Sequence, residues 1–261
     1  MAIPKIIHYC WFGGKPIPEF AQKCIDSWKK YCPDYEIVRW DETNFDLSYN
    51  VYVKEAYENK KWAFVSDVAR LYALVNYGGI YMDTDVEVVK SLDELLEYEA
   101  ITGFQTATEA VTGLMACEKG QKMFKMFLDD YQNEHFVDEN GNFNQTTNVI
   151  RITDACLKYG VRLDNTKQTV EGLTILPTEY LCPKNYYTKE LKMTEKTLTI
   201  HHFDGSWLSD EEKYISSLNV KYRKVLPKLI ADYFAKFYGI TKFRGFKTSV
   251  KETFAWLKRK S

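Results

Sequence analysis

The sequence lacks the features that mark membrane-spanning or disulfide-bonded proteins. It has no run of roughly 18 consecutive apolar residues, so no helix is expected to span a bilayer. The N-terminus, MAIPKIIHYCWFGG, has no basic region followed by a long apolar segment, and no signal peptide is predicted. The six cysteines form no Cys-x-x-Cys pair, which argues against a zinc site and for free thiols in a reducing compartment. We therefore expect a cytoplasmic protein.

The small net charge of −1 hides a strong asymmetry along the chain. Residues 213–261 contain 13 Lys and Arg but only 2 Asp and Glu, a net charge of +11, so the rest carries −12. The 261 residues are enough for one α/β domain with a sizeable core, or for two small domains. We expect the basic C-terminal part to behave as a separate electrostatic object.

The most informative stretch is 62–89, WAFVSDVARLYALVNYGGIYMDTDVEVV. Good helix formers with an apolar stripe predict a helix over Ala63–Tyr77. The pair Gly78-Gly79 follows at the position where helices commonly end in a left-handed conformation. Residues 80–82 are strand-like, so the pattern predicts a helix, a glycine turn and a buried strand.

Two carboxylates follow that strand, in the run Asp83-Thr84-Asp85. Burying an unpaired carboxylate is expensive, so a cation is its usual partner. Oxygen ligands suit Mg²⁺ or Mn²⁺, which keep open positions for water and phosphate oxygens. The run therefore predicts a site for Mn²⁺ or Mg²⁺ and a diphosphate, with Thr84 beside the bound nucleotide.

The combined motifs resemble the core of glycosyltransferase family 32. They are Ser66-Asp67-Val68-Ala69-Arg70 followed by Tyr77-Gly78-Gly79-Ile80-Tyr81-Met82-Asp83-Thr84-Asp85. A lone Asp-x-Asp is common by chance, but these motifs at this spacing are specific. This family includes capsular polysaccharide enzymes, and it is distantly similar to the large clostridial glucosylating toxins. The resemblance implies a GT-A-type nucleotide-diphospho-sugar transferase fold, with a central mixed sheet flanked by helices.

The resemblance assigns the donor sugar to Asp67 and Arg70. These residues lie at i and i+3 of the predicted helix, and an isolated match of this kind is by default an intrahelical ion pair. In related enzymes this Asp and Arg contact the donor sugar and ribose, which suits the fork of an arginine and the acceptor oxygens of a carboxylate. We list Asp67, Arg70 and Asp85 as the catalytic residues.

A strand candidate at Ile3–Phe12, ended by Gly13-Gly14, carries a second point of resemblance. Strand, glycine turn and helix is how α/β nucleotide sites begin, and alternating strands and helices favour a mostly parallel sheet. By resemblance Trp11 lies by the nucleotide base, which favours UDP over GDP. The alternative for Trp11 is a core side chain.

The segment 197–207, TLTIHHFDGSW, resembles the C-terminal metal-histidine segment of retaining transferases. Matching His-Phe-x-Gly selects His202 rather than His201, and neighbours on a strand face opposite ways. The resemblance implies metal ligation by Asp83, Asp85 and His202, with Ser206 and Trp207 covering the diphosphate. The alternative is a pair of strand-end histidines with no ligand.

The predicted reaction is metal-dependent transfer of a hexose, with retention of configuration, to a glycan or lipid-linked saccharide in surface or capsular polysaccharide synthesis. Residues 1–210 form the predicted catalytic domain. No carboxylate pair for a covalent glycosyl intermediate stands out, so no nucleophile is assigned. A metal-dependent phosphohydrolase or nucleotidyltransferase, and a non-catalytic sugar-binding module, stay open as alternatives.

Residues 211–261 are predicted to form a basic amphipathic helical tail, with a break at Pro227 and a second helix from Thr241 onward. Aromatic residues opposite lysines are typical of a helix in a membrane interface. We expect the first helix to dock on the catalytic domain and the second to contact anionic lipid at the inner face of the plasma membrane. No nucleic-acid partner is expected, because no reading element accompanies the charge.

Overall fold

The computed structural model describes residues 2–106, 108–111, 113–205 and 208–258. The chain forms two compact units. The large unit comprises Met1–Lys184 and Lys192–His202, and the small unit comprises Asn185–Leu191 and Phe203–Ser261. The sequence predicts a catalytic domain over residues 1–210 and a tail over residues 211–261. This assignment of roles to the two parts of the chain stays a prediction.

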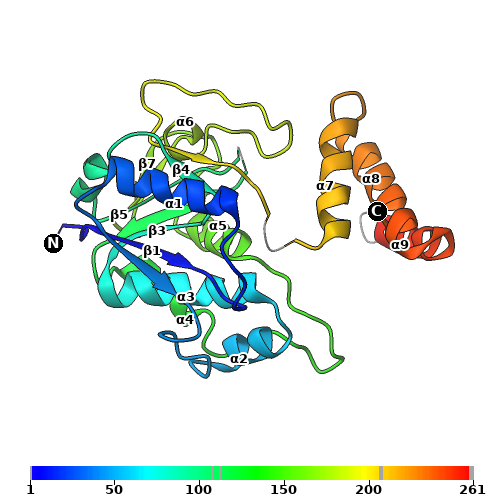
Figure 1. The fold of residues 1–261 in the computed structure, drawn as a ribbon, viewed down its shortest axis with the longest axis horizontal. Helices are drawn as coiled ribbons and strands as arrows, with labels where there is room; N and C mark the ends of the chain where they lie inside the picture. Colours follow the sequence, from blue (N-terminus) through cyan, green and yellow to red (C-terminus); the bar gives the residue numbers. More distant parts are fainter. Residues whose placement is uncertain (1, 107, 112, 206–207, 259–261) are drawn as a thin grey trace. The chain divides into compact units, whose positions relative to one another are not determined.

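Within its described residues, the large unit contains a seven-stranded sheet in the order β2-β1-β3-β6-β5-β8-β7 and a two-stranded sheet of β4 and β9 (Figure 1). The strands are β1 Ile6–Cys10, β2 Glu36–Trp40, β3 Gly79–Met82, β4 Val86–Val88, β5 Ala100–Gly103, β6 Leu114–Cys117, β7 Gln168–Val170, β8 Leu173–Leu176 and β9 Thr199–His201. Strand β1 pairs in parallel with β2 and β3, whereas β6 is antiparallel to β3 and β5. The sheet is therefore mixed, as the resemblance implies. The expectation of a mostly parallel sheet is wrong, because three of the six strand pairings in this sheet are antiparallel.

Helices flank this sheet. In chain order they are α1 Glu19–Tyr31, α2 Val51–Glu58, α3 Trp62–Tyr77, the 3₁₀ helix η1 Asp93–Glu97, α4 Lys122–Asp129, α5 Asn148–Lys158 and α6 Thr178–Leu181. Alternation along β3 sends Tyr81 into the core cluster that contains α3 and α4. Its neighbours Ile80 and Met82 enter a second cluster that contains Trp28 of α1. The α/β class with helices on both faces of a central sheet is confirmed (Figure 1).

The helix α3 is buried along most of its length, with Val65, Val68 and Leu71 inaccessible to solvent. It ends at Gly78, which has φ of +69° and whose N–H bonds the Leu74 carbonyl. A Cβ on Gly78 would lie 2.7 Å from the backbone nitrogen of Lys119. Only glycine fits this conformation and this close approach, so α3 stops here and the chain turns directly into β3.

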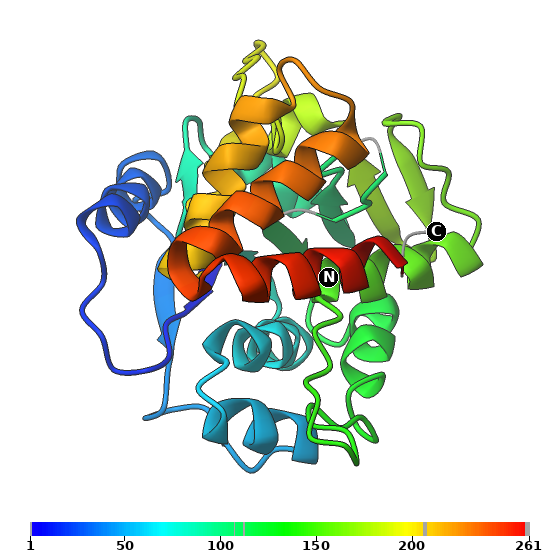
Figure 2. The same ribbon diagram turned by 90° about the vertical axis from the view of Figure 1, so that its right-hand side faces the viewer.

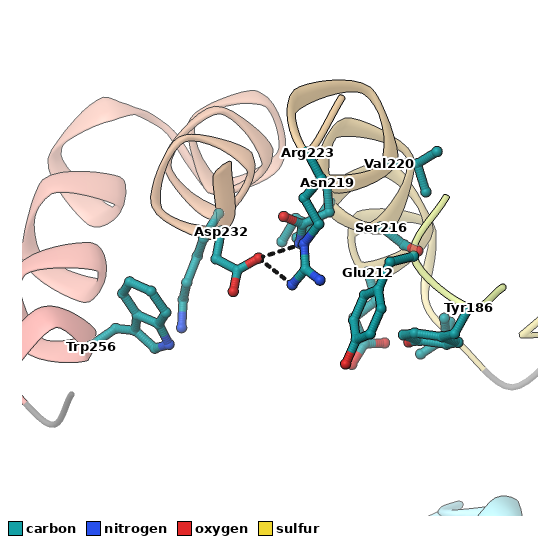
Figure 3. A pocket seen from close by; sticks show the side chains of 12 residues that line it. Tyr186, Glu212, Ser216, Asn219, Val220, Arg223, Asp232 and Trp256 are labelled. Carbon is teal, nitrogen blue, oxygen red and sulfur yellow. Dashed lines mark hydrogen bonds and ion pairs between the residues drawn. The ribbon is translucent and has the colours of Figure 1, made fainter. Parts of the chain in front are cut away.

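The small unit contains α7 Asp210–Tyr222, α8 Lys228–Arg244 and α9 Phe246–Lys258, and α8 packs against both α7 and α9 (Figure 2). The break at Pro227 is confirmed. The expected start of a second helix at Thr241 is wrong, because α8 continues to Arg244 and ends at Gly245, which has φ of +85°. These helices and the segment Asn185–Leu191 line a pocket, shown in Figure 3.

No helix in the described parts of the chain is both long and apolar enough to cross a membrane.

Candidate active site

The Asp-x-Asp turn joins β3 to β4 and is fixed by backbone hydrogen bonds at both ends. The amide of Asp83 donates to the Gly113 carbonyl at 2.8 Å, and the amide of Val86 donates back to the Asp83 carbonyl at 3.0 Å. The Asp85 carbonyl accepts from the His202 amide at 3.0 Å. Because the backbone of the turn is held, the two aspartates project from a rigid support.

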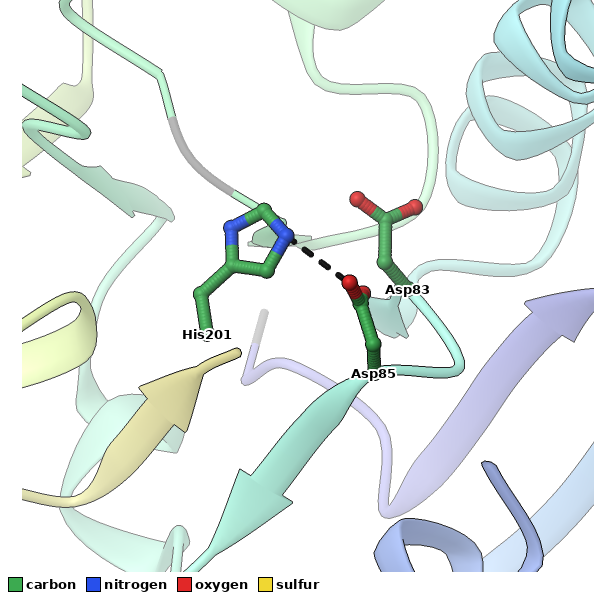
Figure 4. Close-up of side chains that lie close together, drawn as sticks. All are labelled: Asp83, Asp85 and His201. Atoms are coloured by element: carbon green, nitrogen blue, oxygen red, sulfur yellow. Dashed lines mark ion pairs between the residues drawn. The ribbon is translucent and has the colours of Figure 1, made fainter. Parts of the chain in front are cut away.

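Three side chains meet at this turn: Asp83, Asp85 and His201 (Figure 4). Each offers one ligand atom, and these atoms lie within 4.8 Å of one another. His201 reaches the site because β9 pairs antiparallel with β4, which sets His201 opposite Val86. Its Nε2 lies 3.4 Å from Asp85 Oδ1.

These donors fit a divalent ion. Ligands of an octahedral Mg²⁺-type ion lie roughly 3–4 Å from each other, given bond lengths of about 2.1 Å. Two carboxylate oxygens and one imidazole nitrogen suit Mn²⁺ or Mg²⁺ and leave positions for phosphate oxygens and water. The three ligand atoms lie within 4.8 Å of one another, so a small movement of the side chains would bring them to the distances that one bound ion requires.

The histidine beside the aspartates is His201, and this differs from the predicted His202. The ring of His202 is bound elsewhere, with Nε2 2.8 Å from Glu87 Oε2 and Nδ1 3.3 Å from the Lys184 amine. Strand β9 ends at His201, and alternation sends its successor to the opposite side. The geometry therefore corrects the choice made from the motif: His201 is the candidate ligand and His202 is not.

Charge at the site is balanced by His201. Burial lowers the pKa of this imidazole, but the charge and hydrogen bond of Asp85, together with smaller contributions from Cys182, raise it overall to about 10. Without a metal ion the ring is therefore a cation paired with Asp85. A divalent ion would take the place of that proton, because the same nitrogen faces the carboxylate in both cases.

Arg70 connects the helix α3 to the Asp-x-Asp turn. Its guanidinium lies 3.2 Å from Asp67 Oδ1 and 3.1 Å from Asp83 Oδ1, and it stacks on the Tyr81 ring at 4.5 Å. The Tyr81 hydroxyl donates to the same Asp83 oxygen at 3.0 Å. The intrahelical pair considered above is therefore present, and it forms part of a larger buried network that includes one of the two aspartates.

Asp67 occupies the inner end of this network. Burial raises the pKa of its carboxyl to about 6, although Arg70 and the backbone amide of Asn148, which donates at 3.2 Å, lower it in part. Six buried side-chain polar atoms among the described residues have no hydrogen-bond partner, and three of them belong to neighbours of Asp67: Asn148 Nδ2, Tyr52 Oη and Tyr131 Oη. Unsatisfied donors beside a carboxylate suit a ligand that carries hydroxyl groups.

Gly113 lies directly against the metal-ligand candidates. A Cβ on this residue would be 3.0 Å from Asp83 Oδ2 and from His201 Cε1. Sequence reasoning missed Gly113, Asn148 and His201, because each reaches the site through pairing or packing far along the chain. The residues around a single loop glycine, or around an asparagine that begins a helix, do not indicate that it contacts a distant site.

The remaining predicted site residues are less informative. Trp11 follows β1 and is half-buried, and its indole N–H donates to the Lys15 carbonyl at 2.6 Å. Thr84 lies in the turn between the aspartates. Ser206 and Trp207 lie outside the described residues. The nucleotide and diphosphate contacts assigned to these four residues stay predictions.

Comparison with known proteins gives an independent view of the chain. Residues 18–102 match the family described as glycosyltransferase sugar-binding region containing DXD motif. The chain is 36% identical over 131 residues to inositol phosphoceramide mannosyltransferase 3 of Schizosaccharomyces pombe, a match that covers 46% of this chain and 34% of the relative. It is 34% identical over 110 residues to the mannosyl phosphorylinositol ceramide synthase SUR1 of Saccharomyces cerevisiae, covering 38% of this chain and 26% of the relative.

Among solved structures, the PaToxG glycosyltransferase aligns with a TM-score of 0.46 at 21% identity, covering 60% of this chain and 68% of that one. The matches to the two fungal relatives span about a third or less of those proteins' length.

Proposed function

We propose that this chain, whose residues 18–102 match the DXD-containing glycosyltransferase family, is a glycosyltransferase that transfers a hexose from a nucleotide sugar to a glycan or lipid-linked saccharide. Mannose is the first candidate for the transferred sugar, because both fungal relatives are named for mannosyl products. The resemblance at Trp11 favours a UDP-sugar as the donor, whereas mannose is activated as GDP-mannose, so a panel that contains both nucleotides distinguishes the two indications. The process we propose is the synthesis of a surface or capsular polysaccharide.

One observation carries this proposal: both aspartates of the motif converge with His201, and Arg70 contacts one of them, Asp83, at 3.1 Å. Asp83, Asp85 and His201 would hold Mn²⁺ or Mg²⁺. When bound, such an ion neutralises the charge that develops on the diphosphate as the bond between sugar and phosphate breaks.

The protein's own residues would orient the donor. Arg70 is held between Asp67 and Asp83, so its fork has a fixed direction before any ligand arrives. Asp67 accepts hydrogen bonds from hydroxyl groups in its ionised form, and Asn148 Nδ2 is a donor that lacks a partner among the described residues. We infer transfer with retention of configuration, by front-face attack without a protein nucleophile.

The experiment is to incubate the protein with Mn²⁺ and a panel of UDP- and GDP-sugars and to measure nucleotide release. Release of a nucleoside diphosphate with one donor supports the transferase, and the anomeric configuration of the product, read by NMR, tests retention. A nucleoside monophosphate product would instead indicate the phosphohydrolase or nucleotidyltransferase. Binding without turnover of any donor would indicate a sugar-binding module.

We further propose that the small unit holds the enzyme at an anionic membrane surface, as a peripheral protein on the inner face of the plasma membrane. Ile230, Phe234 and Tyr238 expose apolar surface at helical spacing on α8, and Phe246, Val250 and Phe254 do so on α9. Lysines on the same helices add attraction to anionic lipid, at about 1 kcal/mol for each cation near the surface. This location suits an acceptor carried on a lipid.

A further inference from the structure

The pocket of the small unit has a volume of about 400 Å³, which is in the range of small-molecule sites (Figure 3). It is lined by side chains of α7, α8 and α9 and by two tyrosines of the segment Asn185–Leu191. All of these elements belong to the small unit, so the pocket is separate from the Asp-x-Asp site of the large unit.

The charged side chains that line the pocket balance one another. Glu212 and Asp232 are acidic, and Arg223 and Lys236 are basic. Arg223 is also neutralised locally, because its Nη2 lies 2.6 Å from Asp232 Oδ1 and its Nε lies 3.2 Å from the same oxygen. A pocket with no net charge does not select an anion such as a free phosphate, nor a cation.

One polar atom in the wall has no partner. The Oδ1 atom of Asn219 is buried and accepts no hydrogen bond from any described residue. A buried acceptor without a donor is unfavourable. Because Asn219 also lines the pocket, a rotation of its side chain would present Oδ1 to a ligand hydroxyl, which would supply the missing donor. The carboxylates of Glu212 and Asp232 offer further acceptors, and Lys236 offers a donor, as a polyhydroxylated ligand requires.

Aromatic rings complete the lining. The ring of Tyr187 is stacked against the Arg223 guanidinium at 4.2 Å, which fixes that wall, and Tyr186 packs edge-on against Tyr187. Trp256 lines the pocket from α9, in line with the buried Ser249 and Thr253, which face α8. Lys236 lies over the Trp256 ring at 5.9 Å, so one aromatic face already contacts a cation. The remaining aromatic surface would accept the C–H surface of a sugar ring, while the polar groups around it take the hydroxyls.

We propose that this pocket is a saccharide-binding site that takes a neutral sugar of one or two rings. The site is distinct from the proposed donor site, and its binding of a sugar can be measured without the transfer reaction, but the role given next rests on the proposed function. In the full-length protein it would recognise the glycan part of an acceptor or a product.

The test is saturation-transfer NMR on the full-length protein with methyl α-mannoside, methyl β-glucoside, methyl β-galactoside and the corresponding disaccharides at millimolar concentration. At least one should bind, and Trp256→Ala and Asn219→Ala should each weaken its binding tenfold or more. Trp256→Phe, which keeps a ring, should stay within threefold of the natural protein. The matched control is Phe254→Ala, two positions along the same helix and 59% exposed, which should leave binding unchanged.

Asp85→Asn separates this site from the donor site, because it should leave the saccharide signal unchanged. Three results would overturn the proposal. One is that no sugar in the panel binds. Another is that binding survives in both Trp256→Ala and Asn219→Ala but is lost in Asp85→Asn. The third is that only anionic ligands, such as glucuronate or inositol phosphate, give a signal. Thermal unfolding of each variant identifies any that have lost their fold. If Trp256→Ala is one of them, the comparison of Trp256→Phe, which should keep binding, with Asn219→Ala, which should lose it, tests the proposal instead.

Discussion

Arg70 of α3 and Asp83 at the end of β3 form an ion pair of 3.1 Å, and the same guanidinium lies 3.2 Å from Asp67. One arginine therefore ties a proposed sugar-binding carboxylate to a proposed metal ligand. Burial opposes the charged guanidinium, but Asp83, Tyr81 and Asp67 raise its pKa, so it stays charged. Any change at Arg70 should affect both ends of the site.

We expect Arg70→Lys to lower kcat/KM for transfer by about 10²-fold, because lysine keeps the charge but cannot span two carboxylates. The measurement is initial rate against donor concentration, together with Tm. The control is Arg162→Lys, an exposed arginine paired with Asp164, which should change neither quantity. A variant that loses stability but keeps its kcat/KM would show that Arg70 is structural.

The two neighbouring histidines should behave differently. We expect His201→Ala to weaken Mn²⁺ binding by at least about tenfold, because His201 faces the aspartates. His202→Ala should leave Mn²⁺ affinity unchanged, because that ring contacts Glu87 and Lys184 instead. Isothermal titration calorimetry with Mn²⁺ measures the affinity of both variants. The opposite pattern would restore the assignment of His202 made from the motif.

Gly113→Ala should disturb the metal ligands more than the fold. The added Cβ would lie 3.0 Å from Asp83 Oδ2 and from His201 Cε1, so both side chains must move. We expect a loss of Mn²⁺ affinity of about tenfold, which is typical of changes in residues that contact and orient metal ligands. Gly103→Ala is the matched control, since its Cβ meets only Leu181 and the Leu176 carbonyl and should not affect Mn²⁺. Equal effects of the two substitutions would contradict this prediction.

Asp67 should make stability depend on pH. Burial raises its pKa from 3.8 to about 6, so between pH 4 and 6 the folded protein keeps a proton that the unfolded chain releases. The contribution of Asp67 to the free energy of unfolding therefore falls as pH rises through this window. Urea unfolding at pH 4, 5, 6 and 7 should show this slope, and Asp67→Asn should remove it. The same slope in the variant would assign it to other groups.

The proposed membrane role predicts that the full-length protein sediments with anionic liposomes at low salt. Replacing Phe246, Val250 and Phe254 together by serine should reduce the bound fraction several-fold, because these residues form the exposed stripe of α9. Ile150→Ser, at an exposed position of α5 in the large unit, is the control. If no protein sediments, or if the triple variant sediments as well as the natural chain, the stripe does not bind lipid.

Local sequence predicted the elements that depend on neighbouring residues. The helix α3, its end at Gly78, the strand β3 and the following carboxylates all lie within one continuous stretch, and the structure has them as expected. The break at Pro227 belongs to the same class, because proline removes a backbone donor wherever it occurs.

Contacts across the chain were not predictable in the same way. Choosing between His201 and His202 needs the register of β9 against β4, and one residue of slip exchanges the two. The amide of Asn148 reaches Asp67 only because α5 packs against this end of the network. Neither relationship leaves a pattern in the residues on either side, so a family motif was the best available guide, and it selected the neighbouring histidine.

The pairing of β4 with β9 also sets an order of events during synthesis. The aspartates leave the ribosome more than a hundred residues before His201, which at typical translation speeds is a delay on the order of ten seconds. During that interval the nascent chain carries the two acidic ligands without the imidazole. Its affinity for a divalent ion should rise only when the last strand of the large unit joins, so metal capture would report that this unit is complete.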